Sequence, residues 1–159
     1  MLQRLCIATV LVVFSSLAHG AITIESGPVA NQVVQCDEQG KAELHLAGTS
    51  ESAQGHVDAR VRRGRRVVVG WTELSAVADS RWEGSLADVP AGGPYIIELR
   101  AGTGFGRMKE EHKIENVFVG DLWLLAGQSN MQGVGNNEDV EEPDPRVLIF
   151  AMNDTWRVA

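Results

Sequence analysis

The sequence predicts a β-sandwich module followed by the start of an α/β domain, and three observations carry this prediction. Residues 21–115 alternate apolar and polar side chains with period two, as in residues 41–47 and 93–100, which is the pattern of half-buried strands. Turn-forming residues recur between such segments at the spacing of a sandwich. After residue 115 the apolar runs become nearly continuous, as in strands that are covered on both faces.

The first twenty residues precede both units and have the order of a secretory signal peptide. One basic residue, Arg4, is followed by an apolar stretch over residues 5–17 and then by Ala18-His19-Gly20. The apolar stretch is short and interrupted, whereas a membrane helix needs about twenty continuous apolar residues. We expect cleavage after Gly20 and a secreted or periplasmic protein without a membrane anchor.

Cysteine content and charge limit the possible partners. Cys6 leaves with the signal peptide, so Cys36 remains alone and no intrachain disulfide is possible. The formal charge of −7 becomes −8 when Arg4 also leaves. Because negative charge disfavours nucleic acid and anionic lipid, we expect neither nucleic acid nor membrane as a partner. A neutral or sugar-like substrate fits better.

Within the sandwich, four turn signals separate the expected strands. They lie at residues 37–40, 63–65, 90–94 and 102–106. The glycines of the fourth lack the spacing of a nucleotide-binding loop, so we interpret this segment as a turn.

Two features of the sandwich could bind sugars, and each has a simpler structural interpretation. A basic cluster could hold an acidic sugar, but its valine neighbours favour a solvated hairpin tip. The cluster consists of Arg60, Arg62, Arg63, Arg65 and Arg66. Trp71 and Trp82 could stack on a glycan, but in a small sandwich we expect both in the core.

The second unit starts near residue 116. Apolar runs over residues 117–120, 122–126 and 147–151 predict the first strands of an α/β sheet. An acidic stretch over residues 136–144 could bind calcium, but its prolines and the lack of an EF-hand pattern favour a solvated loop. Doubly wound domains are much longer than 116–159, so we expect this chain to be an N-terminal fragment.

Ser129 follows the run 122–126, where the active groups of open α/β sheets gather. Gly127 permits a tight turn, and the N–H groups after the turn would face a developing oxyanion. A serine nucleophile needs a histidine that a carboxylate orients. The remaining histidines all fall in the sandwich, where we expect strand-surface positions: His45, His56 and His112. From these residues alone, Ser129 is either a nucleophile or the cap of a short helix.

A longer stretch around Ser129 favours the nucleophile. It reads Val119-Gly120-Asp121-Leu122-Trp123-Leu124-Leu125-Ala126-Gly127-Gln128-Ser129-Asn130-Met131. It closely resembles the first motif of the sialate O-acetylesterase-like carbohydrate esterases, a branch of the SGNH hydrolases that includes acetylxylan esterases. In that family the serine of Gly-Gln-Ser-Asn-Met is the nucleophile, and a β-sandwich commonly precedes the esterase domain.

The resemblance implies an SGNH-type, flavodoxin-like α/β/α domain and an exported carbohydrate O-acetylesterase. Ser129 would form an acyl-enzyme without metal or organic cofactor, on an O-acetylated carbohydrate whose identity stays open. Gly127, Gln128 and Asn130 would position the turn and the oxyanion site. The family's Asp-x-x-His pair would lie downstream, so we expect residues 1–159 alone to be inactive.

The resulting division is a signal peptide (1–20), a sandwich (21–115) and an incomplete esterase domain (116–159). The alternative is a non-catalytic carbohydrate-binding or adhesion module, in which the sandwich supplies the function and the turn at Ser129 is vestigial.

Overall fold

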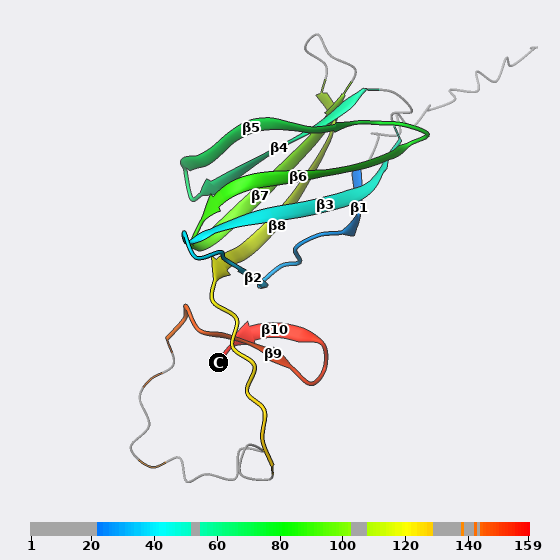
Figure 1. Ribbon diagram of the computed structural model, residues 1–159. Coiled ribbons are helices and arrows are strands. Elements are labelled where there is room, and N and C mark those ends of the chain that lie inside the picture. Colours follow the sequence, from blue (N-terminus) through cyan, green and yellow to red (C-terminus); the bar gives the residue numbers. More distant parts are fainter. Residues whose placement is uncertain (1–21, 52–54, 103–107, 129–137, 139–141, 143) are drawn as a thin grey trace, which may run out of the picture.

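The computed structural model describes residues 22–51, 55–102, 108–128, 138, 142 and 144–159 (Figure 1). The regular structure in these ranges is entirely β. None of the described residues forms a helix that could cross a membrane. The signal peptide expected over residues 1–20 lies outside the described ranges.

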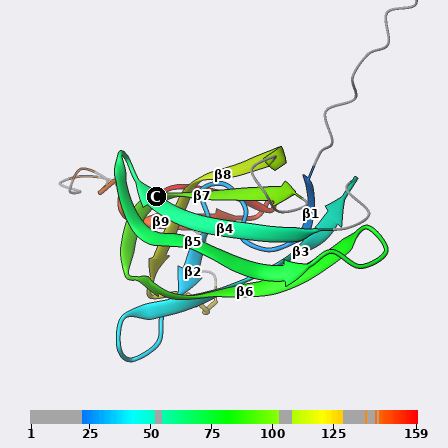
Figure 2. The ribbon, with the colours of Figure 1, turned by 90° about the horizontal axis from the view of Figure 1, so that it is seen from above.

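Two sheets pack face to face, and Figure 2 shows them as two layers. The three-stranded sheet has the order β1–β3–β6, formed by Ile22–Ser26, Lys41–Ser50 and Arg81–Pro90. The five-stranded sheet has the order β2–β8–β7–β4–β5, formed by Val33–Gln35, Met108–Gly120, Gly92–Gly102, His56–Arg63 and Arg66–Ala76. Only the β2–β8 pairing among these is parallel. The prediction of a β-sandwich-like module is therefore confirmed.

The core lies between the two sheets and follows the period of two. Both sheets direct alternate apolar side chains inward, including Leu44, Leu46, Val57, Ala59, Val61, Leu86, Val89, Ile97 and Leu99. Trp82 joins them with 3% of its surface exposed, as predicted. This buried apolar surface is the main favourable contribution to folding of the module.

Three of the predicted turns are confirmed. They connect β2 to β3, β4 to β5 and β6 to β7. In the first, the Asp37 carboxylate accepts two backbone hydrogen bonds within the turn. In the second, Gly64 has a φ of 57°, a left-handed conformation that glycine adopts without a steric penalty. The fourth, at residues 102–106, falls almost entirely outside the described ranges.

The last strand of the sandwich continues beyond the expected boundary at residue 115. Residues 116–120, which the sequence assigned to the second unit, form the end of β8. Val117 and Val119 are buried in the sandwich core. Phe118 points the other way and lies against Gly93, where an added Cβ would come within 2.9 Å of its ring. The inner face of this strand end is buried and Phe118 on the outer face is half-buried, which accounts for the nearly continuous apolar sequence.

The residues beyond β8 differ from the expected α/β pattern. Residues 122–126 form no strand, so that prediction is wrong for this structure. The run 147–151 does contain a strand, β9 (Leu148–Ala151). It pairs antiparallel with β10 (Thr155–Val158) in a two-stranded hairpin. An α/β/α arrangement is not seen among the described residues.

Candidate functional site

The segment that leads to the predicted nucleophile is only partly described. Gly127 and Gln128 are exposed and belong to no helix or strand. Ser129, Asn130 and Met131 lie outside the described residues. The structure therefore shows only the residues that lead up to Ser129, as far as Gln128.

Strand β2 holds the beginning of this approach against the sandwich. The Cys36 N–H donates to the Gly120 carbonyl at 2.9 Å, and the Gln35 side-chain oxygen accepts from the Leu122 N–H at 2.7 Å. The Asp121 carboxylate accepts from the Gln35 amide at 3.5 Å and lies 3.6 Å from the Cys36 sulfur. The first residues of the motif are thus fixed by side chains more than eighty positions earlier in the chain.

The same contacts make Cys36 a poor nucleophile. Removal from water is the largest effect that raises the pKa of this thiol, and the Asp121 carboxylate beside it raises the pKa further. A thiol with a raised pKa has little of the reactive thiolate at neutral pH. Cys36 is free, as the sequence predicted.

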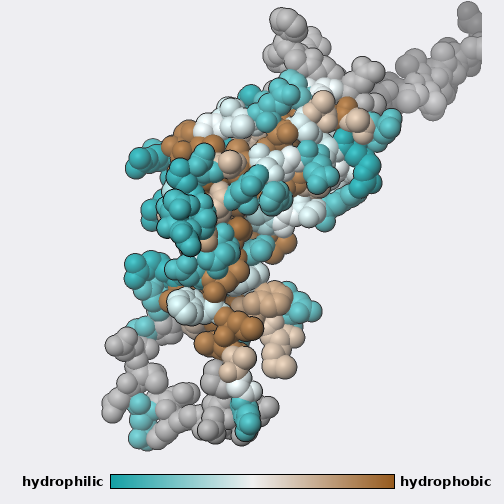
Figure 3. All heavy atoms as spheres, in the orientation of Figure 1, coloured by the Kyte–Doolittle hydropathy of each residue, from teal (hydrophilic) through white to brown (hydrophobic). Residues whose placement is uncertain are grey.

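Beyond Asp121 the chain exposes large apolar side chains. Trp123, Leu124 and Leu125 are 84%, 92% and 79% exposed, and Phe150 and Met152 of the hairpin region are also exposed. Figure 3 shows brown and tan spheres gathered in this part of the molecule, whereas teal, white and brown spheres are mixed on the visible surface of the sandwich. Contiguous exposed apolar residues of this kind mark a surface that another segment or partner covers.

The described histidines do not form a catalytic triad. His45 on β3 is exposed, and its Nδ1 lies 2.7 Å from the Ser85 hydroxyl on β6. This serine–histidine pair lacks the orienting carboxylate of a triad, because no ion pair joins His45 to an acid among the described residues. We therefore interpret it as a cross-strand hydrogen bond on the sheet surface.

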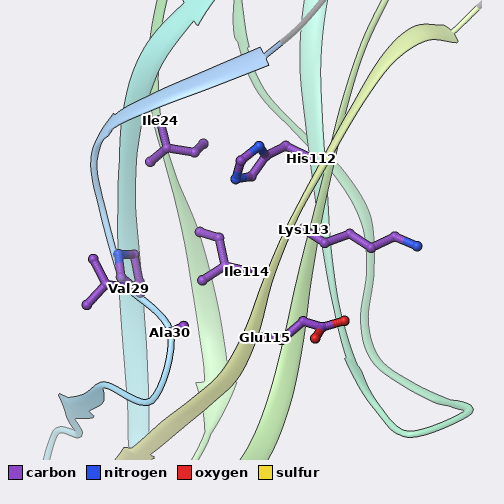
Figure 4. A pocket seen from close by; sticks show the side chains of 8 residues that line it. Ile24, Val29, Ala30, His112, Lys113, Ile114 and Glu115 are labelled. Atoms are coloured by element: carbon purple, nitrogen blue, oxygen red, sulfur yellow. The ribbon is translucent and has the colours of Figure 1, made fainter. Parts of the chain in front are cut away.

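A groove of about 580 Å³ lies between the β1–β2 connection and β8. Figure 4 shows His112 and Ile114 pointing into it, whereas Lys113 and Glu115 point away. Its walls are mostly apolar, from residues such as Ile24 and Val29. The described residues that line this groove include no serine or cysteine, so they offer His112 no nucleophile to activate.

A smaller groove of about 340 Å³ lies at the hairpin tip, lined in part by Arg63, Arg66 and Tyr95. The Tyr95 hydroxyl donates to the Pro90 carbonyl at 3.0 Å. Burial raises the pKa of Tyr95, and the nearby Arg63 charge acts in the opposite direction. Tyr95 is therefore neutral at physiological pH and fixes the β6–β7 turn.

The outer face of the five-stranded sheet carries a network of charges, which we call the charged sheet face. Its members are Asp58, Arg60, Arg62, Trp71, Glu98, Arg100 and Lys113. Glu98 on β7 is 5% exposed and receives three cations, from Arg60, Arg62 and Lys113. Asp58 on β4 accepts two hydrogen bonds from Arg100 at 2.9 and 2.8 Å.

This network corrects two predictions. Arg60 and Arg62 do not belong to a solvated hairpin tip, because both are ion-paired on the sheet face. Trp71 is not a core residue: it is 37% exposed, and the guanidinium groups of Arg60 and Arg100 lie 4.5 and 4.0 Å from its ring centroid.

The cations keep Glu98 ionised despite its burial. Burial alone would raise the pKa of Glu98, but the hydrogen bond from Arg60 and the charges of Arg60, Arg62 and Lys113 together hold it below its ordinary value of 4.5. All three cations around Glu98 are thereby engaged, which leaves this part of the face without a free cation for an anionic ligand.

Comparison with known proteins gives one finding at the end of the chain. Residues 119–159 match the family described as carbohydrate esterase, sialic acid-specific acetylesterase. No curated protein gives a significant match to the chain. The matched segment starts at the end of β8 and includes Gly127-Gln128-Ser129-Asn130-Met131. Over this short segment, the chain resembles a carbohydrate esterase.

Proposed function

We propose that this protein is an exported carbohydrate O-acetylesterase in which Ser129 is the nucleophile. The observation that carries the proposal is the family match over residues 119–159, which contains the Gly-Gln-Ser-Asn-Met segment. The hydrogen bonds that hold Gly120 and Leu122 against the sandwich also support it, because a catalytic serine must be held in position to attack its substrate.

In the proposed reaction, the Ser129 hydroxyl oxygen attacks the carbonyl carbon of an acetyl ester. The sugar oxygen leaves with a proton, and the acetyl group stays bonded to Ser129. Water then attacks this acyl-enzyme, which releases acetate and restores the hydroxyl. Gly127, Gln128 and Asn130 position the turn, and N–H groups there stabilise the oxyanion.

The base and its carboxylate belong to the Asp-x-x-His pattern that the resemblance implies. The printed sequence contains no Asp-x-x-His. The proposal therefore includes a longer gene product that supplies this pair, and its sequence is the first check. A gene product without the pair would contradict the proposed mechanism.

The direct test is acetate release by the full-length gene product from O-acetylated sialic acid and from acetylated xylan. Wild-type protein should release acetate, and Ser129→Ala should lose at least about a thousandfold in rate, since a triad without its nucleophile retains little activity. Ser85→Ala is the matched control, because Ser85 also lies beside a histidine. The proposal fails if Ser129→Ala retains activity.

A second candidate function is glycan binding by the sandwich, which the exposure of Trp71 favours. Trp71 is 37% exposed on the outer face of the sheet, so part of its ring is available to contact a sugar beside the two guanidinium groups. Glycan-array binding by the chain, lost in Trp71→Ala but kept in Ser129→Ala, would support this function. Binding that Trp71→Ala does not change would exclude this surface.

A further inference from the structure

Strands β4 and β5 bring a histidine and two carboxylates to one point on the sheet surface. His56 and Asp58 are two positions apart on β4, and Glu73 pairs with Asp58 across the strands. One ligand atom from each of the three residues lies within 4.8 Å of the other two. Figure 1 shows these strands as neighbours, with β5 at the edge of its sheet.

The two oxygens of the buried Asp58 carboxylate have different surroundings. Oδ2 accepts both hydrogen bonds from Arg100, whereas Oδ1 faces the His56 Nε2 at 3.7 Å, beyond hydrogen-bond distance. Asp58 is 7% exposed, and within the described part of the chain no hydrogen bond to its Oδ1 is found. A carboxylate held on one oxygen by a hydrogen-bond donor and open on the other is the arrangement of an oriented metal ligand.

A cation would also relieve the repulsion between the two acids that face each other across the strands. Like charges directly opposite each other in a sheet are destabilising. Arg100 compensates Asp58, but no ion pair of Glu73 is found in the described part of the chain. A divalent ion between the three side chains would neutralise Glu73 and use the open oxygen of Asp58.

We propose that His56, Asp58 and Glu73 bind a divalent transition-metal ion of the zinc class. Ligands that each lie about 2.0–2.2 Å from a zinc ion are at most about 4.4 Å apart, a limit that the His56–Asp58 distance of 3.7 Å meets. The three ligand atoms lie within 4.8 Å of one another, so binding requires the exposed Glu73 side chain to close the remaining distance by rotation. An imidazole nitrogen favours zinc-like ions, whereas calcium takes six to eight oxygens. The ion joins the edge strand β5 to β4.

The test is isothermal titration of the purified, tag-free chain, starting at Ala21, with Zn²⁺, in a Cys36→Ser background that removes the remaining thiol as a competing ligand. A single Zn²⁺ per chain should bind. His56→Ala and Glu73→Gln should each weaken binding by more than about tenfold. The matched controls, His45→Ala and Glu43→Gln on the other sheet, should bind as the parent does.

A thermal scan gives a second readout, because an ion that binds only the folded state raises the melting temperature. Zn²⁺ should raise it in the parent and in both controls, but not in Glu73→Gln. Glu73 is exposed, so this variant folds and the comparison stays meaningful. The proposal is overturned if the parent binds no Zn²⁺, or if both site variants bind it as tightly as the controls.

Discussion

At the residue scale, the two tryptophans of the sandwich have different surroundings. Trp82 lies on the inner face of the three-stranded sheet, and Trp71 lies on the outer face of the five-stranded sheet. Trp82 is enclosed between the layers, whereas Trp71 rests against two guanidinium groups at the surface. Their sequence surroundings are similar alternating strands, which do not show which face of a strand points inward. The partner residues Arg60 and Arg100 come from two other strands, so the stacking depends on a register that the sequence does not reveal.

We expect the two tryptophans to differ in their effect on stability. Trp82→Ala leaves a cavity in the core and should lower the free energy of unfolding by about 3–5 kcal/mol. Trp71→Ala removes two partly exposed cation–π contacts and should cost about 1–2 kcal/mol. Urea unfolding of both variants measures the difference. Equal losses would mean that Trp71 is as enclosed as Trp82.

Glu98 should make the stability of the sandwich depend on pH. Its pKa is lowered in the folded state, so its contribution is present above the unfolded-state pKa and is lost as pH falls through the folded value. Glu98→Gln should cost about 1.5–3 kcal/mol at neutral pH, the worth of hydrogen bonds to a charged group. The difference from wild type should shrink below pH 4.5. Glu43→Gln, exposed on β3, is the control; a loss independent of pH would contradict the role of the charge.

At the element scale, the joint between β2 and the end of β8 is where the sandwich meets the esterase-like segment. We expect Gln35→Ala to accelerate hydrogen exchange of the Leu122 amide several-fold, because that amide loses its acceptor. Global stability should change little, since the contact is at the surface. Gln39→Ala, in the neighbouring turn, should leave this amide unchanged. Unchanged exchange in Gln35→Ala would show that the joint does not depend on this side chain.

The strands of the sandwich could be predicted from the sequence because one face of each is buried and the other faces solvent, which makes apolar and polar residues alternate. The sequence places the boundary at residue 115, whereas β8 runs on to Gly120, because Val117 and Val119 face the core and Phe118 lies against Gly93 on the other face. A strand covered on both faces has the same sequence pattern in a sandwich and in an α/β sheet. Residues 122–126 have that pattern too, but among the described residues no strand pairs with them.

Of the two candidate sites, one could be predicted from the sequence and the other could not. The Gly-Gln-Ser-Asn-Met segment could be found because its residues are consecutive. The grouping of His56, Asp58 and Glu73 could not, because it depends on a bulge between β4 and β5 that sets Asp58 opposite Glu73. The alternation of apolar and polar residues predicts exposed strand faces but does not show which polar side chains meet on them.

At the scale of the whole molecule, the exposed apolar segment at residues 122–125 is the clearest sign of a missing contact. In the chain of 159 residues, Leu124→Ser should change stability by less than about 0.5 kcal/mol, because this side chain is 92% exposed. The proposed full-length gene product covers this side chain with a further segment, so the same change should cost about 2–5 kcal/mol there. Leu46→Ser, in the sandwich core, should destabilise both proteins. A neutral Leu124→Ser in the longer protein would argue against such a cover.

The central claim, that Ser129 is the nucleophile, is tested most directly by covalent labelling of the full-length gene product with a fluorophosphonate, followed by tryptic peptide mapping. Trypsin releases residues 114–146 as one peptide, and Ser129 is the only serine, threonine or tyrosine within it. If Ser129 is the nucleophile, the phosphonyl adduct should lie on this peptide, and acetate release should be lost as the adduct forms. An adduct on a different serine, with acetate release abolished and this peptide unmodified, would contradict it.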